Sequence, residues 1–242
     1  MLTYKHTMVS CFVGYIVQAI VNNFVPLLFI TFQSSYGIPL SQITLLVTFN
    51  FIVQILTDLV AAKYIDRIGY RAGMVLAHLF SALGLAGLTV LPAIMDPFAG
   101  ILLSVMIYAI GGGLLEVLVS PVMESCPTDN KETAMSLLHS FYCWGHVGVV
   151  LISTVFFYFA GIENWKVLAL AWALIPVCNG LVFLKTPIAS LMEEGEKGMT
   201  FSELFRNKPS MTAMPTIQRT AVMWVNRSSD RLSAGGLGCA PD

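Results

Sequence analysis

One carboxylate, Glu116, lies in a long apolar run, after Gly111-Gly112-Gly113 and two leucines. An ionised carboxylate at the centre of a bilayer costs roughly 2.5–3.5 kcal/mol on insertion scales, so it is neutral, paired, or placed in a water-filled cavity. A carboxyl group that moves between these states can take up and release a proton. We therefore predict Glu116 as a proton-coupling residue. The alternative is a glutamate that a neighbouring Asn or His holds for packing specificity.

Three further apolar runs carry polar side chains three, four, seven or eight positions apart, which places them on one face of a helix. These stripes are Tyr15, Gln18 and Asn22 in the first run, Asn50, Gln54 and Asp58 in the second, and His139, Tyr142 and His146 in the third. Each stripe alone is equally consistent with hydrogen bonds that hold helices together. Four polar faces in one apolar chain favour a shared cavity, where amides, imidazoles and aromatic rings suit a small polar solute. We predict these substrate-binding residues: Gln18, Asn22 and Asn23 in the first run, Asn50 and Gln54 in the second, and His139, Tyr142 and His146 in the third.

The same residues predict neither a metal site nor a cofactor. His139 and His146 are seven residues apart with no third ligand, and the five cysteines are scattered without a CxxC pair. No paired catalytic carboxylates and no nucleophile–base set occur near a membrane face. We therefore expect a protein that is not an enzyme and that carries no cofactor.

The composition indicates the kind of protein that carries these groups. Of the 242 residues, 56% are hydrophobic and only 11% are charged, whereas soluble domains are about 25% charged. The mean hydropathy is +0.76. The formal net charge of −1 excludes nucleic-acid binding driven by phosphate neutralisation. The sequence therefore predicts an integral membrane protein whose first partner is the lipid bilayer.

A bilayer core needs about 20 mostly apolar residues per helix, and six runs meet that length. Asp96-Pro97 predicts a tight reversal after the third run, because proline cannot continue a helix. In the remaining spans, we expect His78 to reach the membrane interface and Asn179 to mark a kink beside Pro176. The predicted fold is an all-α membrane protein with spans at residues 8–32, 43–62, 73–95, 98–123, 135–160 and 167–184.

The basic residues predict the orientation. If the N-terminus is cytoplasmic, Lys166 alone lies in an outer loop. The inner segments then hold the other basic residues of the first 208 positions: Lys5, Lys63, Arg67, Arg71, Lys131, Lys185, Lys197, Arg206 and Lys208. This positive-inside bias predicts a multi-pass protein of the plasma (inner) membrane with both termini in the cytoplasm.

The C-terminal part changes in character. We divide the chain into a six-helix bundle at 1–190, a cytoplasmic linker at 191–208 and a tail at 209–242, which we expect to be disordered because its composition cannot bury a core. Residues 201–205 look like a short interfacial turn ahead of a further span, yet no apolar run follows. Two explanations stay open: a natural cytoplasmic tail, or an out-of-frame ending after the true continuation was lost.

The segment between the second and third runs is Tyr64-Ile65-Asp66-Arg67-Ile68-Gly69-Tyr70-Arg71. We predict a tight cytoplasmic hairpin in which glycine supplies backbone freedom. The segment resembles the signature loop of the major facilitator superfamily, Gly-x-Leu-Ala-Asp-Arg-x-Gly-Arg-Arg. The matching residues are Asp66, Arg67, Gly69 and Arg71, whereas Ala62, Tyr64 and Tyr70 depart from the pattern. The resemblance implies that this loop gates the movement of two halves of a twelve-helix transporter.

Six helices also fit one half of that fold, which consists of two inverted three-helix repeats. Within the superfamily, Val21-Asn22-Asn23-Phe24 and Gly113-Leu114-Leu115-Glu116 resemble the fucose permease group of sugar:proton symporters, as does Leu137-Leu138-His139-Ser140-Phe141-Tyr142. The group's helix-four glutamate, implicated in proton and sugar binding, matches Glu116. Its helix-one aspartate is absent, since Pro26 stands about there.

Together these observations predict a secondary active transporter, or its truncated N-terminal half, that moves a small polar solute such as a sugar with protons by alternating access. We expect a missing C-terminal six-helix half, or a second copy, as partner. One alternative is a non-transporting membrane fragment or interaction partner. Another is an efflux transporter of the same superfamily, which Gly148-Val149 disfavours because exporters carry Gly-Pro in helix five.

Overall fold

The computed structural model describes residues 3–128 and 130–188, except for the side chain of Asp66. The chain divides into two units, residues 1–194 and 195–242, and all described residues lie in the first. The predicted linker at 191–208, its turn at 201–205 and the tail at 209–242 lie outside the described residues, so the predicted domain boundaries stay predictions.

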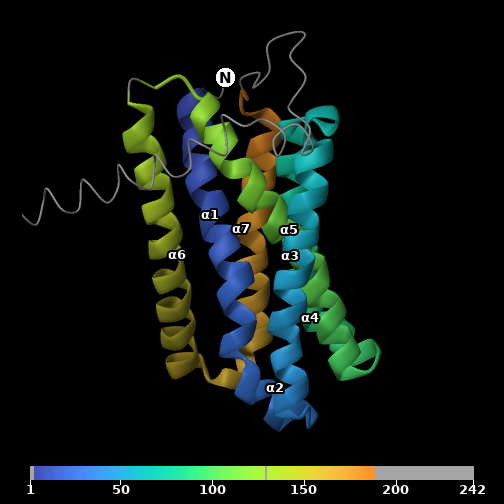
Figure 1. The fold of residues 1–242 in the computed structure, drawn as a ribbon. Coiled ribbons are helices and arrows are strands. Elements are labelled where there is room, and N and C mark those ends of the chain that lie inside the picture. The colour runs from blue at the N-terminus through green and yellow to red at the C-terminus, as the bar shows by residue number, and fades with distance from the viewer. Residues whose placement is uncertain (1–2, 129, 189–242) are drawn as a thin grey trace, which may run out of the picture. The chain divides into compact units, whose positions relative to one another are not determined.

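The described residues form seven α-helices and one short 3-10 helix, joined by tight connections (Figure 1). Six helices are long and apolar enough to cross a membrane, which confirms the predicted number of spans. The elements are α1 (Tyr4–Leu27), α2 (Phe29–Tyr36), α3 (Leu40–Ile68), α4 (Tyr70–Ile94), α5 (Pro97–Ser125), α6 (Lys131–Ala160), η1 (Ile162–Asn164) and α7 (Trp165–Lys185).

The first predicted span, 8–32, is interrupted. α1 ends at Leu27, and α2 begins at Phe29. Pro26 lies in the last turn of α1 and has no backbone N–H, so one backbone hydrogen bond of the helix is missing there. The N–H of Leu28 bonds instead to the carbonyl of Val25, which tightens the turn and offsets α2 from α1.

Local sequence signals explain the other helix ends. Asp96 accepts a hydrogen bond from the N–H of Ala99 and Pro97 occupies the first turn of α5, so the predicted reversal is an N-cap. Asn130 caps α6 in the same way through the N–H of Thr133. Gly37 ends α2 with φ +66°, in the left-handed region that glycine tolerates without strain.

The six spans pack as two interlocked triplets, α1–α3–α4 and α5–α6–α7. α1 contacts α5 directly; α1 also packs against α6, whereas α5 packs against α3. The leading helix of each triplet thus packs against the second helix of the other, as expected for two related repeats. α4 and α7, the last helices of the triplets, pack against each other.

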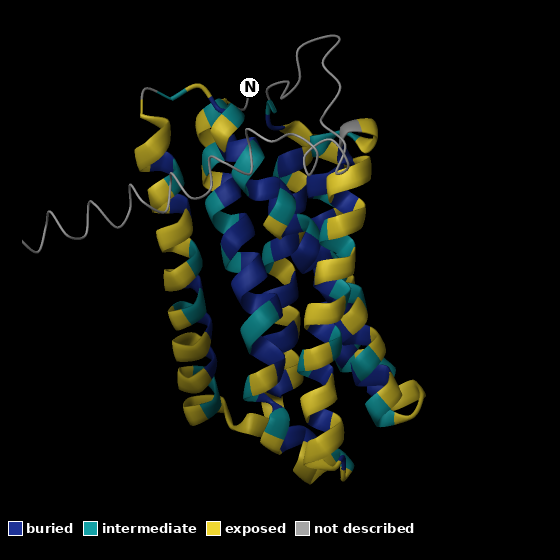
Figure 2. Cartoon of the chain, viewed as in Figure 1, coloured by how far each residue is buried: buried dark blue, intermediate teal, exposed yellow. Residues whose placement is uncertain are grey.

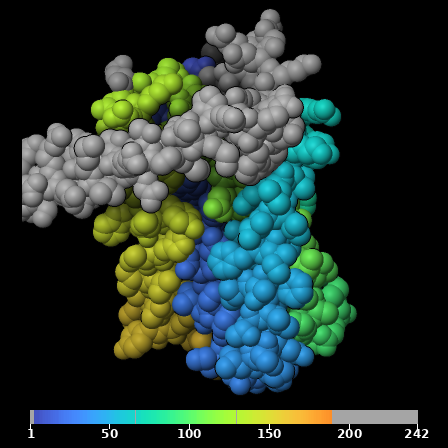
Figure 3. Space-filling view, viewed as in Figure 1, coloured from blue at the N-terminus to red at the C-terminus, as the bar shows by residue number. Residues whose placement is uncertain are grey.

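α1 and α5 are the most buried spans, and α3 and α6 are the least buried (Figure 2). In Figure 3, α1 is visible between α6 and α3 on the face turned toward the viewer. The large exposed side chains of α6 are apolar and aromatic, among them Trp144, Tyr158 and Phe159. The two central helices therefore hold the bundle together, while α3 and α6 border the face on which α1 and the end of α5 lie.

Candidate functional site

Three consecutive glycines let α5 approach three different helices. A Cβ on Gly111 would lie 2.5 Å from the carbonyl oxygen of Ala77 in α4, and one on Gly112 would lie 3.0 Å from Val21 in α1. A Cβ on Gly113 would lie 2.9 Å from the carbonyl oxygen of Gln54 in α3. Successive residues of a helix point about 100° apart, so each glycine faces one neighbour. This close packing brings Glu116, one turn further along α5, beside both α1 and α3.

Glu116 accepts a hydrogen bond from α1. The side-chain nitrogen Nε2 of Gln18 lies 3.0 Å from Oε2 of Glu116. Gln18 is only 2% exposed, whereas Glu116 is exposed. The carboxyl group is therefore held from the protein side by a buried amide and is open on its other side.

A cluster of amide side chains joins α1 to α3. Nε2 of Gln54 donates to Oδ1 of Asn22 at 2.8 Å and to Oδ1 of Asn50 at 3.1 Å. Asn50 also donates to Oδ1 of Asn22, at 3.3 Å. Asn50 and Gln54 are buried, and Asn22 is partly exposed. Asn22 is therefore the member of this cluster that reaches an open surface.

Aromatic side chains join α1 to α6. The ring centroid of Tyr142 lies 5.4 Å from that of Tyr15 in an edge-to-face arrangement. Tyr15 also lies 5.9 Å from the ring of His139 and shares a 2.7 Å hydrogen bond with Ser120 of α5. His146 contacts Tyr142 with ring centroids 4.3 Å apart. Side chains of α1 thus contact polar and aromatic side chains of α3, α5 and α6, and together these residues form one cluster around α1.

Asn23 does not join this cluster, although it was predicted with the others. Its Nδ2 donates to the carbonyl of Ala19 in its own helix, at 2.8 Å. Asn23 is the next residue after Asn22 and points about 100° away from it, so only one of the two asparagines can face α3. The other predicted binding residues form three sets of contacts: Asn22 with Asn50 and Gln54, Gln18 with Glu116, and the rings of His139 and Tyr142 through Tyr15, with His146 against Tyr142.

Asp58 is the third residue of the polar stripe of α3. It carries a carboxyl group, whereas Asn50 and Gln54 carry amides. Its Oδ1 is buried and has no hydrogen-bond partner among the described residues. It interacts electrostatically with Glu116. The buried Oε1 of Gln18 also lacks a partner in the described part of the chain. The region around Glu116 therefore contains more hydrogen-bond acceptors than donors.

In the predicted loop at 64–71, only Gly69 lies outside a helix, and the chain turns from α3 to α4 at this corner. α3 continues through Asp66 and Arg67 to Ile68, and α4 begins at Tyr70, so the predicted hairpin is helical except at Gly69. Gly69 has φ +89°, which disfavours any residue with a Cβ. The side chain of Asp66 lies outside the described residues.

Arg71 connects this corner to the end of another helix. Its Nη1 donates to the carbonyl of Leu184 at 3.1 Å, in the last turn of α7. Carbonyl groups at a helix C-terminus lack intrahelical partners and carry partial negative charge, so a cation is favourable there. The motif arginine therefore links the α3–α4 corner to the C-terminus of α7.

A second polar cluster, which the sequence analysis did not predict, lies between α1, α4 and α7. Nδ2 of Asn179 donates to the carbonyl of Ser10 at 2.9 Å and lies 2.8 Å from Nε2 of His78. Nδ1 of His78 lies 2.7 Å from the carbonyl of Met74. The expectation that His78 reaches the interface is wrong, because the residue is 1% exposed. An Asn and a His in separate spans give no local signal that they meet.

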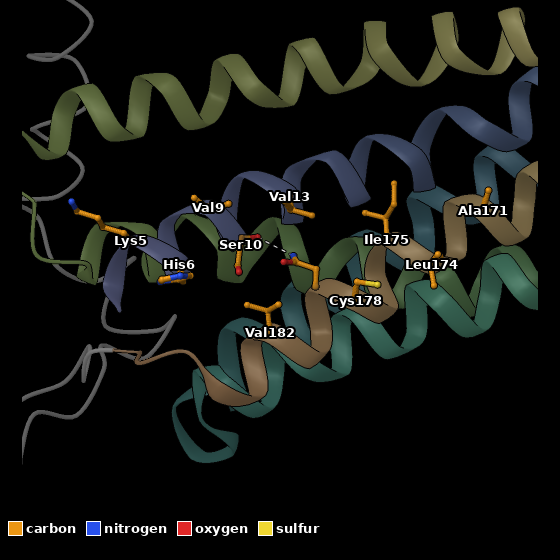
Figure 4. A pocket seen from close by; sticks show the side chains of 11 residues that line it. Lys5, His6, Val9, Ser10, Val13, Ala171, Leu174, Ile175, Cys178 and Val182 are labelled. Carbon is orange, nitrogen blue, oxygen red and sulfur yellow. Dashed lines mark hydrogen bonds between the residues drawn. The ribbon is translucent and has the colours of Figure 1, made fainter. Parts of the chain in front are cut away.

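A cavity of about 570 Å3 lies between α1 and α7 (Figure 4). Lys5 and His6 lie at one end, and Ala171 lies at the other; most of the lining side chains are apolar. Val9 and Val13 line it from the face of α1 opposite to Gln18 and Asn22. This cavity is therefore separate from the polar cluster around Glu116.

Within the described residues, no group of three or more His, Cys, Asp or Glu side chains could hold a metal ion. What the fold does present is a bundle of six membrane-spanning helices whose inner helices carry a hydrogen-bonded polar cluster and an exposed carboxyl group. These are the features of a multi-pass membrane transport protein, in which binding groups lie at the interface of helical repeats.

The chain belongs to the Major Facilitator Superfamily, whose family model matches residues 8–235. A comparison with curated protein sequences found no match.

Solved structures share the fold. The inward-open xylose transporter XylE from E. coli matches with a TM-score of 0.66 at 13% identity, over 88% of this chain and 55% of that one. A POT family transporter in complex with a thioalcohol-conjugated peptide gives 0.55 at 16%, over 93% of this chain and 46% of its own. A POT family transporter in complex with 5-aminolevulinic acid gives 0.55 at 15%, with the same coverage. The chain thus spans about half the length of these proteins, and at such identities the likeness concerns the fold alone.

Proposed function

We propose that this chain is the N-terminal half of a secondary active transporter that moves a small polar solute, such as a sugar, together with protons by alternating access. The observation that carries the proposal is the cluster that joins four helices around Asn22 and Glu116. The likeness in fold to a xylose transporter is consistent with a sugar, although fold does not determine substrate.

Glu116 has the proton-coupling role in this proposal. Its carboxyl group is exposed in the isolated bundle and is held by one amide donor from Gln18. Such a group can exchange a proton with water when the cavity is open, and it favours the neutral form when water is excluded. Proton binding and cavity closure are thereby coupled.

The solute would contact the open side of the same cluster. Asn22 offers an amide, and Tyr142, His139 and His146 offer aromatic faces and hydrogen-bonding atoms. Asn50 and Gln54 are buried behind Asn22 and hydrogen-bond to it, so in this proposal they orient that amide. Directed hydrogen bonds together with flat apolar surfaces are the usual way to bind a small polyhydroxylated molecule.

A second six-helix bundle would cover this site. Lipid tails cannot hydrogen-bond to an exposed carboxyl group or amide, so the face between α3 and α6 requires water or protein against it. In this proposal the covering bundle is a C-terminal half or a second copy of the chain. Arg71 and the Gly69 corner would then take part in gating, both termini would be cytoplasmic, and the protein would lie in the plasma (inner) membrane.

One specific observation favours the alternative of a non-transporting fragment: the chain spans only 55% of the length of XylE. Proteoliposomes that hold the purified chain and a pH-sensitive dye in the lumen separate the two functions. With L-fucose or D-xylose as probe, symport predicts that external sugar acidifies the lumen, that a protonophore abolishes the gradient, and that Glu116→Gln removes the response.

Glu124→Gln, on the same helix, is the matched control and should respond as the wild type does. A sugar-dependent response that survives Glu116→Gln would refute the role of this carboxyl group. No response and no sugar uptake by the wild-type chain would favour the fragment.

A further inference from the structure

Asp58 is a second carboxyl group inside the membrane, one helix away from Glu116. It lies on α3, which packs against α5. Its Oδ1 is buried and has no donor among the described residues, although a buried carboxylate normally requires several. The proton-coupling role proposed above does not use this residue.

A backbone acceptor lies near Oδ1 of Asp58. A Cβ on Gly113 would lie 2.9 Å from Oδ1 of Asp58 and also 2.9 Å from the carbonyl oxygen of Gln54, so the two oxygens border the same small space. Gln54 precedes Asp58 by four residues. At this separation a side-chain O–H can donate to the backbone carbonyl, which has a second lone pair free for it. A carboxylic acid fits this position, whereas a carboxylate does not.

Glu116 adds to the effect, because its negative charge disfavours a second negative charge on Asp58. On α4, which also contacts α3, Arg71 and His78 bond toward α7. The buried Oε1 of Gln18, whose Nε2 donates to Glu116, also has no partner among the described residues.

We propose that Asp58 is a second proton-binding site of this protein and that its protonated side chain donates to the Gln54 carbonyl. The proposal rests on the proton-coupling function above and extends it from one carboxyl group to two. Asp58 would hold a proton at a partly buried position on α3, one helix away from the exposed Glu116.

Infrared spectroscopy of the purified chain in lipid nanodiscs tests this directly, because a protonated carboxylic acid has a carbonyl stretch that an ionised one lacks and that shifts in D2O. At mildly acidic pH the wild type should show this band. Asp58→Asn should lose it, while Glu116→Gln and the exposed control Asp96→Asn should retain it.

A wild type without the band, or a band that Glu116→Gln removes and Asp58→Asn preserves, would overturn the proposal. Stability supplies a second measurement. The Asn amide can donate to the Gln54 carbonyl as the acid does, so Asp58→Asn should unfold at the same or higher denaturant concentration than the wild type; a clear loss of stability counts against a protonated Asp58. The band reports proton occupancy and not flux, so a chain that transports nothing can still confirm this site.

Discussion

Nε2 of Gln18 donates to Oε2 of Glu116 at 3.0 Å, and this contact joins the leading helices of the two triplets, α1 and α5. Gln18 is buried and Glu116 is exposed, so the bond holds the carboxyl group from the protein side. In the proposed transporter, the strength of this bond would determine how strongly protonation of Glu116 affects α1.

A double-mutant cycle measures this coupling. Gln18→Ala and Glu116→Ala, singly and together, should show an interaction free energy of about 0.6 kcal/mol and at most about 1.7 kcal/mol, the range for hydrogen bonds between transmembrane helices. The measurement is unfolding of the purified chain in mixed detergent micelles. Asn23→Ala replaces Gln18→Ala as the control and should give no coupling to Glu116, because Asn23 bonds within its own helix.

Gly111→Ala should strongly destabilise the bundle. The added methyl group would meet the backbone carbonyl of Ala77, which cannot move without displacing α4. Overpacking of this kind costs about 1–3 kcal/mol. Thermal unfolding in detergent checks the value against Gly148→Ala on α6, where a Cβ meets nothing within 4 Å. Gly148→Ala should leave stability unchanged or slightly raised, since alanine is the better helix former; equal losses in the two variants would contradict the packing role.

Arg71→Leu should loosen the end of α7. The substitution removes the donor to the Leu184 carbonyl and the positive charge near the helix C-terminus. Hydrogen–deuterium exchange should become several-fold faster in the last turn of α7 and stay unchanged in its middle. Arg67→Leu, on α3, controls for the loss of one positive charge at the corner. Unchanged exchange in α7 after Arg71→Leu would refute the link.

Asn179→Ala should destabilise the packing of α1, α4 and α7. It leaves Nε2 of the buried His78 and the carbonyl of Ser10 without their donor, and an unsatisfied buried group costs about 1–3 kcal/mol. Detergent unfolding measures the loss. Asn23→Ala, which removes an asparagine bond inside one helix, should cost less. A comparable loss in both variants would mean that the interhelical bonds of Asn179 contribute little.

Helix positions and ends could be predicted because their causes are local. Apolar runs of about 20 residues specify membrane spans whatever packs beside them, and Asp96 with Pro97 specifies a cap within a few residues. The same local chemistry explains the two differences. Pro26 interrupts the first span, and Gly69 alone makes the corner for which a longer hairpin was predicted.

Partners between helices could be predicted only in part. The spacing of Tyr15, Gln18 and Asn22 correctly placed them on one face of α1, because the period of the helix determines the face. It could not determine which residue of another span each would meet. Asn22 and Asn23 have the same chemistry, and only the docking of α3 on α1 decides that Asn22 accepts from Gln54 while Asn23 bonds to its own backbone.

The sequence by itself determined a six-span membrane protein with polar side chains on four of its helices, because hydropathy, length and helical period are properties of single segments. The tertiary structure decided that Gln18 meets Glu116, that Oδ1 of Asp58 has no donor among the described residues, and that His78 and Asn179 form a separate buried pair. Those relationships depend on the close approach of α5 to three helices at once, and no single segment contains that information.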